Sequence, residues 1–134
     1  MKSLLDNNIR NIISSMKTIA VVGLSPKESR PSNMVARYLL EAGYTIIPVN
    51  PGQDEILGMT CYPDLNAVPV PVDIVTIFRR SDAVPAVIEQ AIQIGAKAVW
   101  MQVGVINEKA ADLARKAGLA VVMDRCLKMD HQSM

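Results

Sequence analysis

The strongest constraint on the fold is an uninterrupted run of small and apolar residues, Thr18 to Val22, that stops at Gly23. A run of this length without polar alternation is typical of a strand covered on both faces, as in a parallel sheet. Gly23 permits a tight turn or the close approach of a ligand to the backbone. The sequence therefore predicts a buried first strand whose carboxyl end lies at a turn or a binding site.

The polar loop after this strand has the composition of an anion site. It carries Ser25, Lys27 and Arg30 and ends at Pro31 and Ser32. These last two are typical of a first helical turn, where amides lack partners in any case. Free amides together with two cations predict a phosphate-binding corner. The alternative is that the loop is only a solvated connection.

Strand and helix patterns alternate along the rest of the chain. Apolar runs predict four further strands, at residues 44–49, 72–78, 98–103 and 119–123. The helices between them are predicted to use two N-caps, Ser81 and Asn107, and three glycine stops, Gly43, Gly95 and Gly118. Residues 53–71 predict only a short strand or turn and a short helix near residues 64–65. This order predicts an α/β fold, a three-layer, doubly wound, mostly parallel sheet of the Rossmann-like kind.

The length of 134 residues fits a single domain spanning residues 1–134. We expect residues 1–16 to form an amphipathic helix that caps the sheet, and residues 17–131 to form the core. A partner-binding helix is the alternative for residues 1–16. Polar residues, among them Asp6 and Arg10, interrupt the apolar stripe, so we expect neither a signal peptide nor a membrane-spanning segment.

The net charge and the number of cysteines limit the binding partners and the cellular compartment that we expect. The formal net charge is only +1, which argues against bulk attraction to nucleic acid or to a membrane. Two cysteines, Cys61 and Cys126, favour free thiols in a reducing compartment, so we expect a cytoplasmic protein. Six cations nevertheless follow the predicted strands: Lys27, Arg30, Arg79, Arg80, Arg125 and Lys128. Because the carboxyl ends of parallel strands share one edge, these cations predict a ligand with several phosphates.

Missing motifs exclude the commonest ligands of such an edge. The three-glycine dinucleotide fingerprint is absent, and the second strand ends in Asn50 and Pro51 where an NAD site offers an acid to the ribose. The P-loop pattern is also absent. A receiver domain needs acidic residues after its first strand, and none follows Val22. NAD, P-loop nucleotidase and receiver functions are therefore disfavoured.

Five ordered blocks of sequence carry a more specific signal: residues 22–27 with 30–32, 49–51, 72–75 with 78–79, 99–102 with 104, and 122–128 with 131. Through these blocks the chain resembles the small stand-alone CoA-binding proteins, whose domain is similar to the nucleotide-binding domain of the succinyl-CoA synthetase α subunit. The resemblance implies that coenzyme A, or an acyl-CoA, lies across the carboxyl edge of the sheet. It implies these binding residues: Gly23, Leu24, Ser25, Lys27, Arg30, Ser32, Asn50, Pro51, Phe78, Arg79, Ser81, Trp100, Gln102, Arg125 and Cys126.

The same resemblance implies a role for each group. Gly23 and Ser25 would present amide and hydroxyl donors to a phosphate, with charge added by the nearby cations. Asn50 and Pro51 would shape the adenosine side, and Phe78 would cover the adenine. Arg79 would reach a phosphate, and Ser81 would open the next helix toward it. Four residues would lie nearer the pantetheine: Trp100, Gln102, Arg125 and Cys126. Plain core packing stays open for Phe78 and Trp100.

Reactive side chains are few. Cys126 is flanked by Arg125 and Lys128, which would favour its thiolate, although an ordinary buried thiol is the simpler interpretation. His131 is the sole histidine, so no site that needs a histidine pair can form. The succinyl-CoA synthetase also uses a phosphorylated histidine outside this domain and a second subunit, and neither is encoded here. We therefore expect a ligand-binding module without a complete active site.

Two alternatives of other classes stay open. The first is a thiol-dependent redox or acyl-transfer enzyme that uses Cys126. The second is a regulatory partner of a larger CoA enzyme, which would associate through residues 1–16. Self-association is also left open by the sequence.

Overall fold

The computed structural model describes the backbone of residues 4–134 and the side chains from Asn7 onward. The N-terminal helix predicted over residues 1–16 is observed as α1, Leu4–Ser15. The first three residues of that prediction lie outside the described residues. Buried Ile9, Ile12 and Ile13 face the protein interior, as the amphipathic pattern requires.

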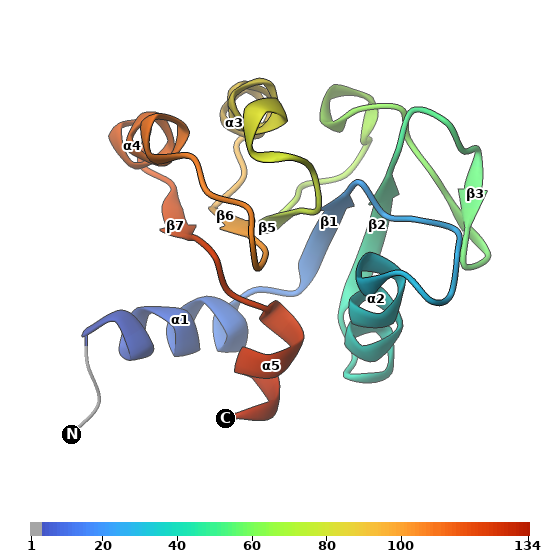
Figure 1. Ribbon diagram of the computed structural model, residues 1–134, viewed down its shortest axis with the longest axis horizontal. Coiled ribbons are helices and arrows are strands. Elements are labelled where there is room, and N and C mark those ends of the chain that lie inside the picture. Colours follow the sequence, from blue (N-terminus) through green and yellow to red (C-terminus); the bar gives the residue numbers. More distant parts are fainter. Residues whose placement is uncertain (1–3) are drawn as a thin grey trace.

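Five parallel strands form the central sheet in the order β2-β1-β5-β6-β7 (Figure 1). They are β1 Thr18–Val22, β2 Thr45–Val49, β5 Ile74–Ile77, β6 Ala98–Met101 and β7 Ala120–Val122. In the register, Val22 of β1 lies beside Val49 and Ile77, so three strands end level with one another. The predicted Rossmann-like α/β fold is confirmed, with each of the last four strands shorter than predicted.

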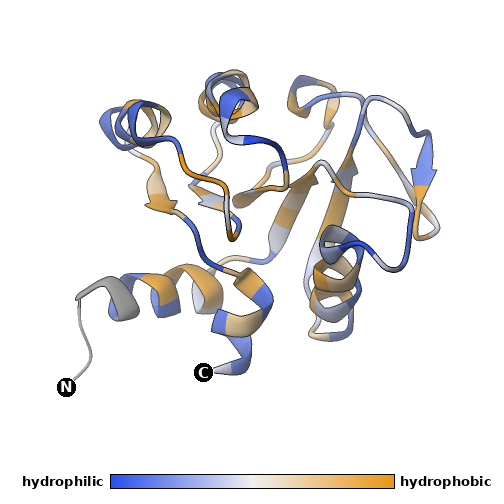
Figure 2. Cartoon of the chain, viewed as in Figure 1, coloured by the Kyte–Doolittle hydropathy of each residue, from blue (hydrophilic) through white to orange (hydrophobic). Residues whose placement is uncertain are grey.

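Helices cover both faces of this sheet (Figure 1). On one face lie α3, Val84–Gln93, and α4, Glu108–Lys116, and on the other lie α1, α2, Pro31–Glu41, and α5, Leu127–Gln132. Alternate residues of β1 pack into the two resulting cores, Ala20 and Val22 into one, Ile19 and Val21 into the other. Figure 2 shows the apolar colouring concentrated on the strands and on the helix sides that face them. Burial on both faces explains the uninterrupted apolar run of the first strand.

The stretch 53–71, which has little pattern in the sequence, contains a small hairpin. It consists of β3 Glu55–Ile56 and β4 Met59–Thr60, followed by a 3₁₀ helix, η1, at Leu65–Ala67. The expected short helix near residue 64 is confirmed, because the Asp64 side chain accepts a hydrogen bond from the Ala67 amide and caps η1. The predicted glycine stops at Gly43, Gly95 and Gly118 all adopt positive φ values.

Two helix predictions need correction. Ser81 is not an N-cap, because it lies inside a 3₁₀ helix, η2, Ser81–Ala83, which precedes α3. The C-terminal segment, for which no element was predicted, forms α5, held by its buried Leu127. Asn107 does cap α4, as predicted, by accepting a hydrogen bond from the Ala110 amide.

Candidate functional site

The site begins where β1 and β5 end side by side. The chain leaves β1 toward β2 on one side and later returns to β5 on the other, so the connections diverge at this point. Such a switch point is where open α/β sheets bind ligands. Gly23 makes the close approach possible, since it has a φ of +88° and a Cβ there would lie 2.4 Å from the carbonyl oxygen of Phe78. Only glycine fits this position.

Side chains of α2 hold the loop after β1 in one conformation. The Ser32 hydroxyl accepts a hydrogen bond from the Ser25 amide at 2.9 Å, and Asn33 Nδ2 donates to the Ser25 carbonyl at 2.9 Å. Arg37 donates to the Glu28 carbonyl and to Asn33 Oδ1, both at 2.8 Å. Asn33 and Arg37 were not predicted as site residues. Their spacing of four on one helix, after a polar loop, is the only signal that the sequence offers.

The donors available at this corner differ from those expected. The Gly23 amide donates to the Val49 carbonyl at 2.8 Å, and the Ser25 amide is bonded to Ser32, so neither is free for a phosphate. The predicted Gly23 amide donor is thus already used within the fold, whereas the predicted Ser25 hydroxyl accepts from the Lys27 amide and keeps its own hydrogen to donate. Within residues 4–134, the amides of Leu24, Ser32 and Asn33 have no acceptor, and Arg30 provides no side-chain cap for α2. Leu24, whose side chain is fully buried, can contribute only through its backbone.

Asn50 joins the ends of β1 and β2. Its Nδ2 donates to the Leu24 carbonyl at 2.9 Å, while its Oδ1 accepts from the Gly52 amide at 2.9 Å. Both ends of the amide are thus used in shaping the loop, and Pro51 lies exposed in the adjoining turn. The neighbouring Cys61 thiol contacts the Asn50 carbonyl at 3.5 Å, and burial is the main cause that raises the pKa of Cys61.

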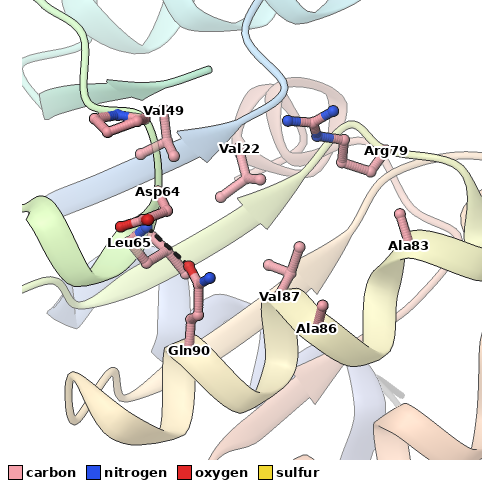
Figure 3. A pocket seen from close by; sticks show the side chains of 10 residues that line it. Val22, Val49, Asp64, Leu65, Arg79, Ala83, Ala86, Val87 and Gln90 are labelled. Atoms are coloured by element: carbon pink, nitrogen blue, oxygen red, sulfur yellow. Dashed lines mark hydrogen bonds between the residues drawn. The ribbon is translucent and has the colours of Figure 1, made fainter. Parts of the chain in front are cut away.

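Arg79 lines two clefts that open over the strand ends, and also a hollow of about 480 Å³ that it shares with Arg80, Asp82 and Ala83. The α3 cleft, of about 210 Å³, lies between the ends of β1 and β2, η1 and α3 (Figure 3). The α5 cleft, of about 630 Å³, lies between α2, the ends of β5 and β6, and α5. No acidic side chain of the described chain pairs with Arg79, which Figure 3 shows reaching from the end of β5 toward the β1 side. Arg79, which has no carboxylate partner in the described chain, therefore lies between the α3 cleft and the α5 cleft.

Only part of the predicted cation cluster is available to a ligand. Arg80 pairs with Asp82 at 3.1 Å, and Arg125 pairs with Asp130 through two contacts of 2.8 Å. Lys128 lies over the Tyr38 ring, with Nζ 5.6 Å from its centroid. Arg80, Arg125 and Lys128 thus already have partners within the protein, which leaves fewer of the six cations for a phosphorylated ligand. Three remain without a carboxylate partner in the described part of the chain: Lys27, Arg30 and Arg79.

Two of the residues predicted nearer the pantetheine, Gln102 and Cys126, line the α5 cleft, and Arg125, predicted with them, pairs with Asp130. Phe78, predicted to cover the adenine, lines the same cleft. Trp100 does not, since it is 0% exposed and its Nε1 donates to the Arg125 carbonyl at 2.8 Å. The prediction that Trp100 contacts the ligand is wrong, and the alternative of core packing holds for it. Phe78 is partly buried against the same core and also lines the α5 cleft, so its contact with the adenine stays a prediction.

Ser81 connects two loops and does not face a cleft. Its hydroxyl accepts a hydrogen bond from the Ile106 amide at 3.0 Å, and its carbonyl accepts from Asn107 Nδ2 at 3.0 Å. These bonds tie the loop after β5 to the loop after β6. Ser81 therefore positions the wall of the site, which differs from its expected role of opening a helix toward a phosphate.

Reactive groups are sparse around the clefts. Cys126 is partly buried, and the two cations expected beside its thiol are engaged with Asp130 and Tyr38. His131 lies at the far end of α5, where its Nδ1 is 2.5 Å from the Tyr38 hydroxyl. Among residues 4–134, no cluster of three or more histidine, cysteine or acidic side chains is arranged to hold a metal ion.

None of the described helices is both long and apolar enough to cross a membrane.

Comparison with known proteins agrees with this geometry. A family model described as "CoA binding domain" matches residues 17–132. The chain is 43% identical to Bacillus subtilis YneT, itself described as uncharacterized, over 92% of this chain and 91% of YneT. A solved hypothetical protein from Pyrococcus horikoshii OT3 superposes with a TM-score of 0.94 at 40% identity, covering 99% of this chain and 98% of that one.

A longer relative shows the same domain in another setting. Acetate–CoA ligase (ADP-forming) I of Archaeoglobus fulgidus is 29% identical over 84% of this chain, but the match covers only 18% of the ligase. The chain thus spans less than a fifth of that enzyme. The family match confirms the resemblance predicted from the five sequence blocks.

Proposed function

Because the chain belongs to the CoA binding domain family, we propose that it binds coenzyme A or an acyl-CoA at the carboxyl edge of its sheet. The observation that carries this proposal is the position of Arg79, a cation without a carboxylate partner in the described chain, between two clefts at the switch point. A ligand with phosphates in its middle and a different group at each end suits such a site.

The phosphates would lie against the loop after β1. Arg79 and Arg30 supply charge, the Ser25 and Ser32 hydroxyls supply donors, and the unpaired amides at Leu24 and the start of α2 supply further N–H groups. The helix start favours negative charge as well. Lys27, exposed on the same loop, adds a second flexible cation. Since α2 holds this loop through three hydrogen bonds, little order has to be gained on binding.

The rest of the ligand would divide between the clefts. In Rossmann-like folds the adenosine half lies over the first two strands, which here border the α3 cleft with Val22 and Val49. Asn50 and Pro51 would follow β2 on that side, and the acid that lines the α3 cleft, Asp64, caps η1 with its side chain. The α5 cleft, with Phe78, Gln102 and Cys126, would then take the remainder of the ligand.

We propose a binding module with no complete active site, acting in the cytoplasm. The match covers only 18% of the acetate–CoA ligase, so most of that enzyme lies outside the part that resembles this chain. A protein that acts on the bound CoA, or a second copy of this chain, would supply further groups.

Titration calorimetry of the reduced protein tests the proposal directly. CoA should bind more tightly than dephospho-CoA, NAD or ATP, and Arg30→Ala should weaken CoA binding about tenfold through loss of a charge-assisted contact. Arg115→Ala is the matched control, because Arg115 lies on α4 and pairs with Asp112. Heat with NAD or ATP but none with CoA would refute the proposal.

A second candidate function uses Cys126, and the observation that favours it is the placement of this partly exposed thiol in the wall of the α5 cleft. There it could react with a thioester or disulfide of the bound ligand. Cys126→Ser should abolish such a reaction and leave CoA affinity within about twofold, because serine keeps the shape of the side chain. Unchanged turnover of an acyl-CoA by the serine variant would exclude this candidate.

A further inference from the structure

We infer that the α5 cleft binds the pantetheine arm through a hydrogen bond from one of its amide N–H groups to Oε1 of Gln102, and that Thr76 orients Gln102 for this contact. The inference rests on the proposed function and deepens it, because it assigns one part of the ligand to one cleft. It also adds Thr76, a residue of β5, as a positioning residue of the site.

A directional chain of hydrogen bonds fixes the orientation of the Gln102 amide. The Thr76 hydroxyl donates to the Trp100 carbonyl at 3.4 Å, so its oxygen is left to accept. Gln102 Nε2 donates to that oxygen at 2.8 Å. If the amide were reversed, the Thr76 hydroxyl would have to give up its bond to the Trp100 carbonyl in order to donate to Oε1. Thr76 therefore holds the NH₂ group inward.

The other end of the amide is turned to the cleft. Gln102 is only 4% exposed and lines the α5 cleft. No hydrogen bond is formed by Oε1 within residues 4–134, and no fully buried side-chain nitrogen or oxygen of the described residues lacks a partner. Oε1 thus keeps its small accessible area, and the surface that it borders is the cleft. An accessible acceptor on a nearly buried side chain favours a ligand that brings an N–H donor, since a bound ligand that excludes water and leaves the acceptor unpaired loses binding energy.

The other residues that line the α5 cleft determine which kind of ligand segment can carry that N–H group. Val35, Phe78, Val105 and Met129 make them largely apolar, and the Arg80 guanidinium at the margin is paired with Asp82. A flexible, uncharged chain that carries isolated amides matches a largely apolar cleft with one fixed acceptor. Pantetheine is such a chain, whereas a phosphate would lose its hydration without gaining a free cation beyond Arg79.

The α3 cleft has the opposite hydrogen-bonding character, which supports placing adenine there. Gln90 Oε1 accepts from the Leu65 amide at 3.0 Å, so its NH₂ group is the free end (Figure 3). The ring nitrogens of adenine are acceptors and suit a donor of this kind. Adenine also carries an amino group that could reach Gln102, and the experiment below separates these two arrangements.

The test compares CoA with adenosine 3′,5′-bisphosphate, which lacks the pantetheine arm, by calorimetry on the full chain. Gln102→Met, similar in length and without the acceptor, should weaken CoA binding about tenfold and leave the bisphosphate within about twofold. Thr76→Val, which removes only the hydroxyl, should weaken CoA binding about threefold because Gln102 can then turn. Thr76→Ser restores the hydroxyl and should restore the affinity, an effect that a role in packing alone does not predict.

Each remaining outcome overturns one of the two claims. Equal losses for both ligands in Gln102→Met would place the adenine in the α5 cleft and refute the inference while leaving CoA binding intact. Unchanged CoA affinity in both Gln102→Met and Thr76→Val would also refute it. Wild-type protein that binds neither ligand would refute the proposed function itself. Retained bisphosphate binding shows that each variant is folded.

Discussion

The two clefts at the carboxyl edge share Arg79 but are built from different material. The α3 cleft is small, about 210 Å³, and is bounded by β1, β2, the 3₁₀ helix η1 and α3. The α5 cleft is three times as large, about 630 Å³, and is bounded by α2, by the loops after β5 and β6 and by the short helix α5. One cation thus serves two compartments of unequal size, which is what an elongated ligand with unlike ends requires.

A glutamine in each cleft sharpens the difference. Gln90 is held by its carbonyl oxygen and Gln102 by its NH₂ group, so the first offers a donor and the second an acceptor. The same residue type therefore produces opposite hydrogen-bonding surfaces, and the neighbouring partner decides which one. The sequence shows that a glutamine is present, but it does not show whether its carbonyl oxygen or its NH₂ group is hydrogen-bonded to the protein.

We expect the largest effect from Gly23→Ala, which should disturb the strand ends that border both clefts. A Cβ at this position would meet the Phe78 carbonyl oxygen at 2.4 Å in a backbone with φ +88°. We expect a loss of about 3 kcal/mol or more in the free energy of unfolding, together with loss of CoA binding. Urea denaturation measures the first and calorimetry the second.

Gly118→Ala is the control for this variant, since Gly118 has φ +91° but no atom within 4 Å of an added Cβ. It should cost only the conformational strain, about 1 kcal/mol, and leave binding unchanged. Equal destabilisation by the two alanines would show that the contact with Phe78 is unimportant.

Arg79→Ala should disconnect the clefts without unfolding the protein. Because no described carboxylate pairs with this arginine, its loss leaves no buried acid unpaired. CoA affinity should fall about 30-fold, corresponding to about 2 kcal/mol for charge-assisted hydrogen bonds, and the salt dependence of binding should decrease. Calorimetry at two ionic strengths is the measurement. An affinity within twofold of wild type would mean that Arg79 does not touch the ligand.

Gln90→Met separates the α3 cleft from the α5 cleft. The Leu65 amide would lose its acceptor, so the free energy of unfolding should fall by about 1 to 2 kcal/mol. Affinity for adenosine 3′,5′-bisphosphate and for CoA should both fall severalfold, because both carry adenine, whereas Gln102→Met should weaken CoA alone. If Gln90→Met and Gln102→Met affect the two ligands alike, the clefts do not read different parts of one ligand.

The smallest effect concerns the opposite edge of the sheet and should spare both clefts. Burial alone would raise the pKa of Asp73, but hydrogen bonds from the Lys17 and Thr18 amides, each 3.0 Å, and Lys97 at 3.2 Å outweigh it and lower the pKa. A lowered pKa stabilises the fold above the ordinary carboxyl value, about 3.9, and the contribution is lost as pH falls through the folded-state pKa.

Asp73→Asn should therefore reduce stability by about 1 kcal/mol at pH 7 and flatten its decline below pH 4. Urea unfolding at pH 7, 4 and 3 measures both. CoA affinity at pH 7 should stay unchanged, and a loss of affinity would contradict the independence of the two edges.

Strong local patterns made the fold predictable. The apolar run of β1 and the glycines that end helices could be recognised in the sequence because each depends on the backbone conformation of only a few neighbouring residues. Arg79 and the loop after β1 could be predicted for a similar reason, since any residue that follows a parallel strand lies at the same edge.

Partnerships between distant residues could not be predicted. Whether Arg125 is free depends on Asp130 in a helix that the sequence did not suggest, and whether Trp100 faces a ligand depends on the Arg125 carbonyl. Asn33 and Arg37 have ordinary positions on a helix, and their role follows only from the loop that folds over them. Charge counts in a sequence thus overstate the charge that a ligand meets.

The contact between Gly23 and Phe78 has a consequence for how the protein folds. It joins segments far apart in the chain, and the bond from the Gly23 amide to Val49 draws in a third segment. No contiguous fragment shorter than β1 through β5 can assemble this corner, so binding competence arrives late, after the slow long-range pairing of strands. A ligand that recognises the corner would then slow unfolding and leave the rate of folding nearly unaffected.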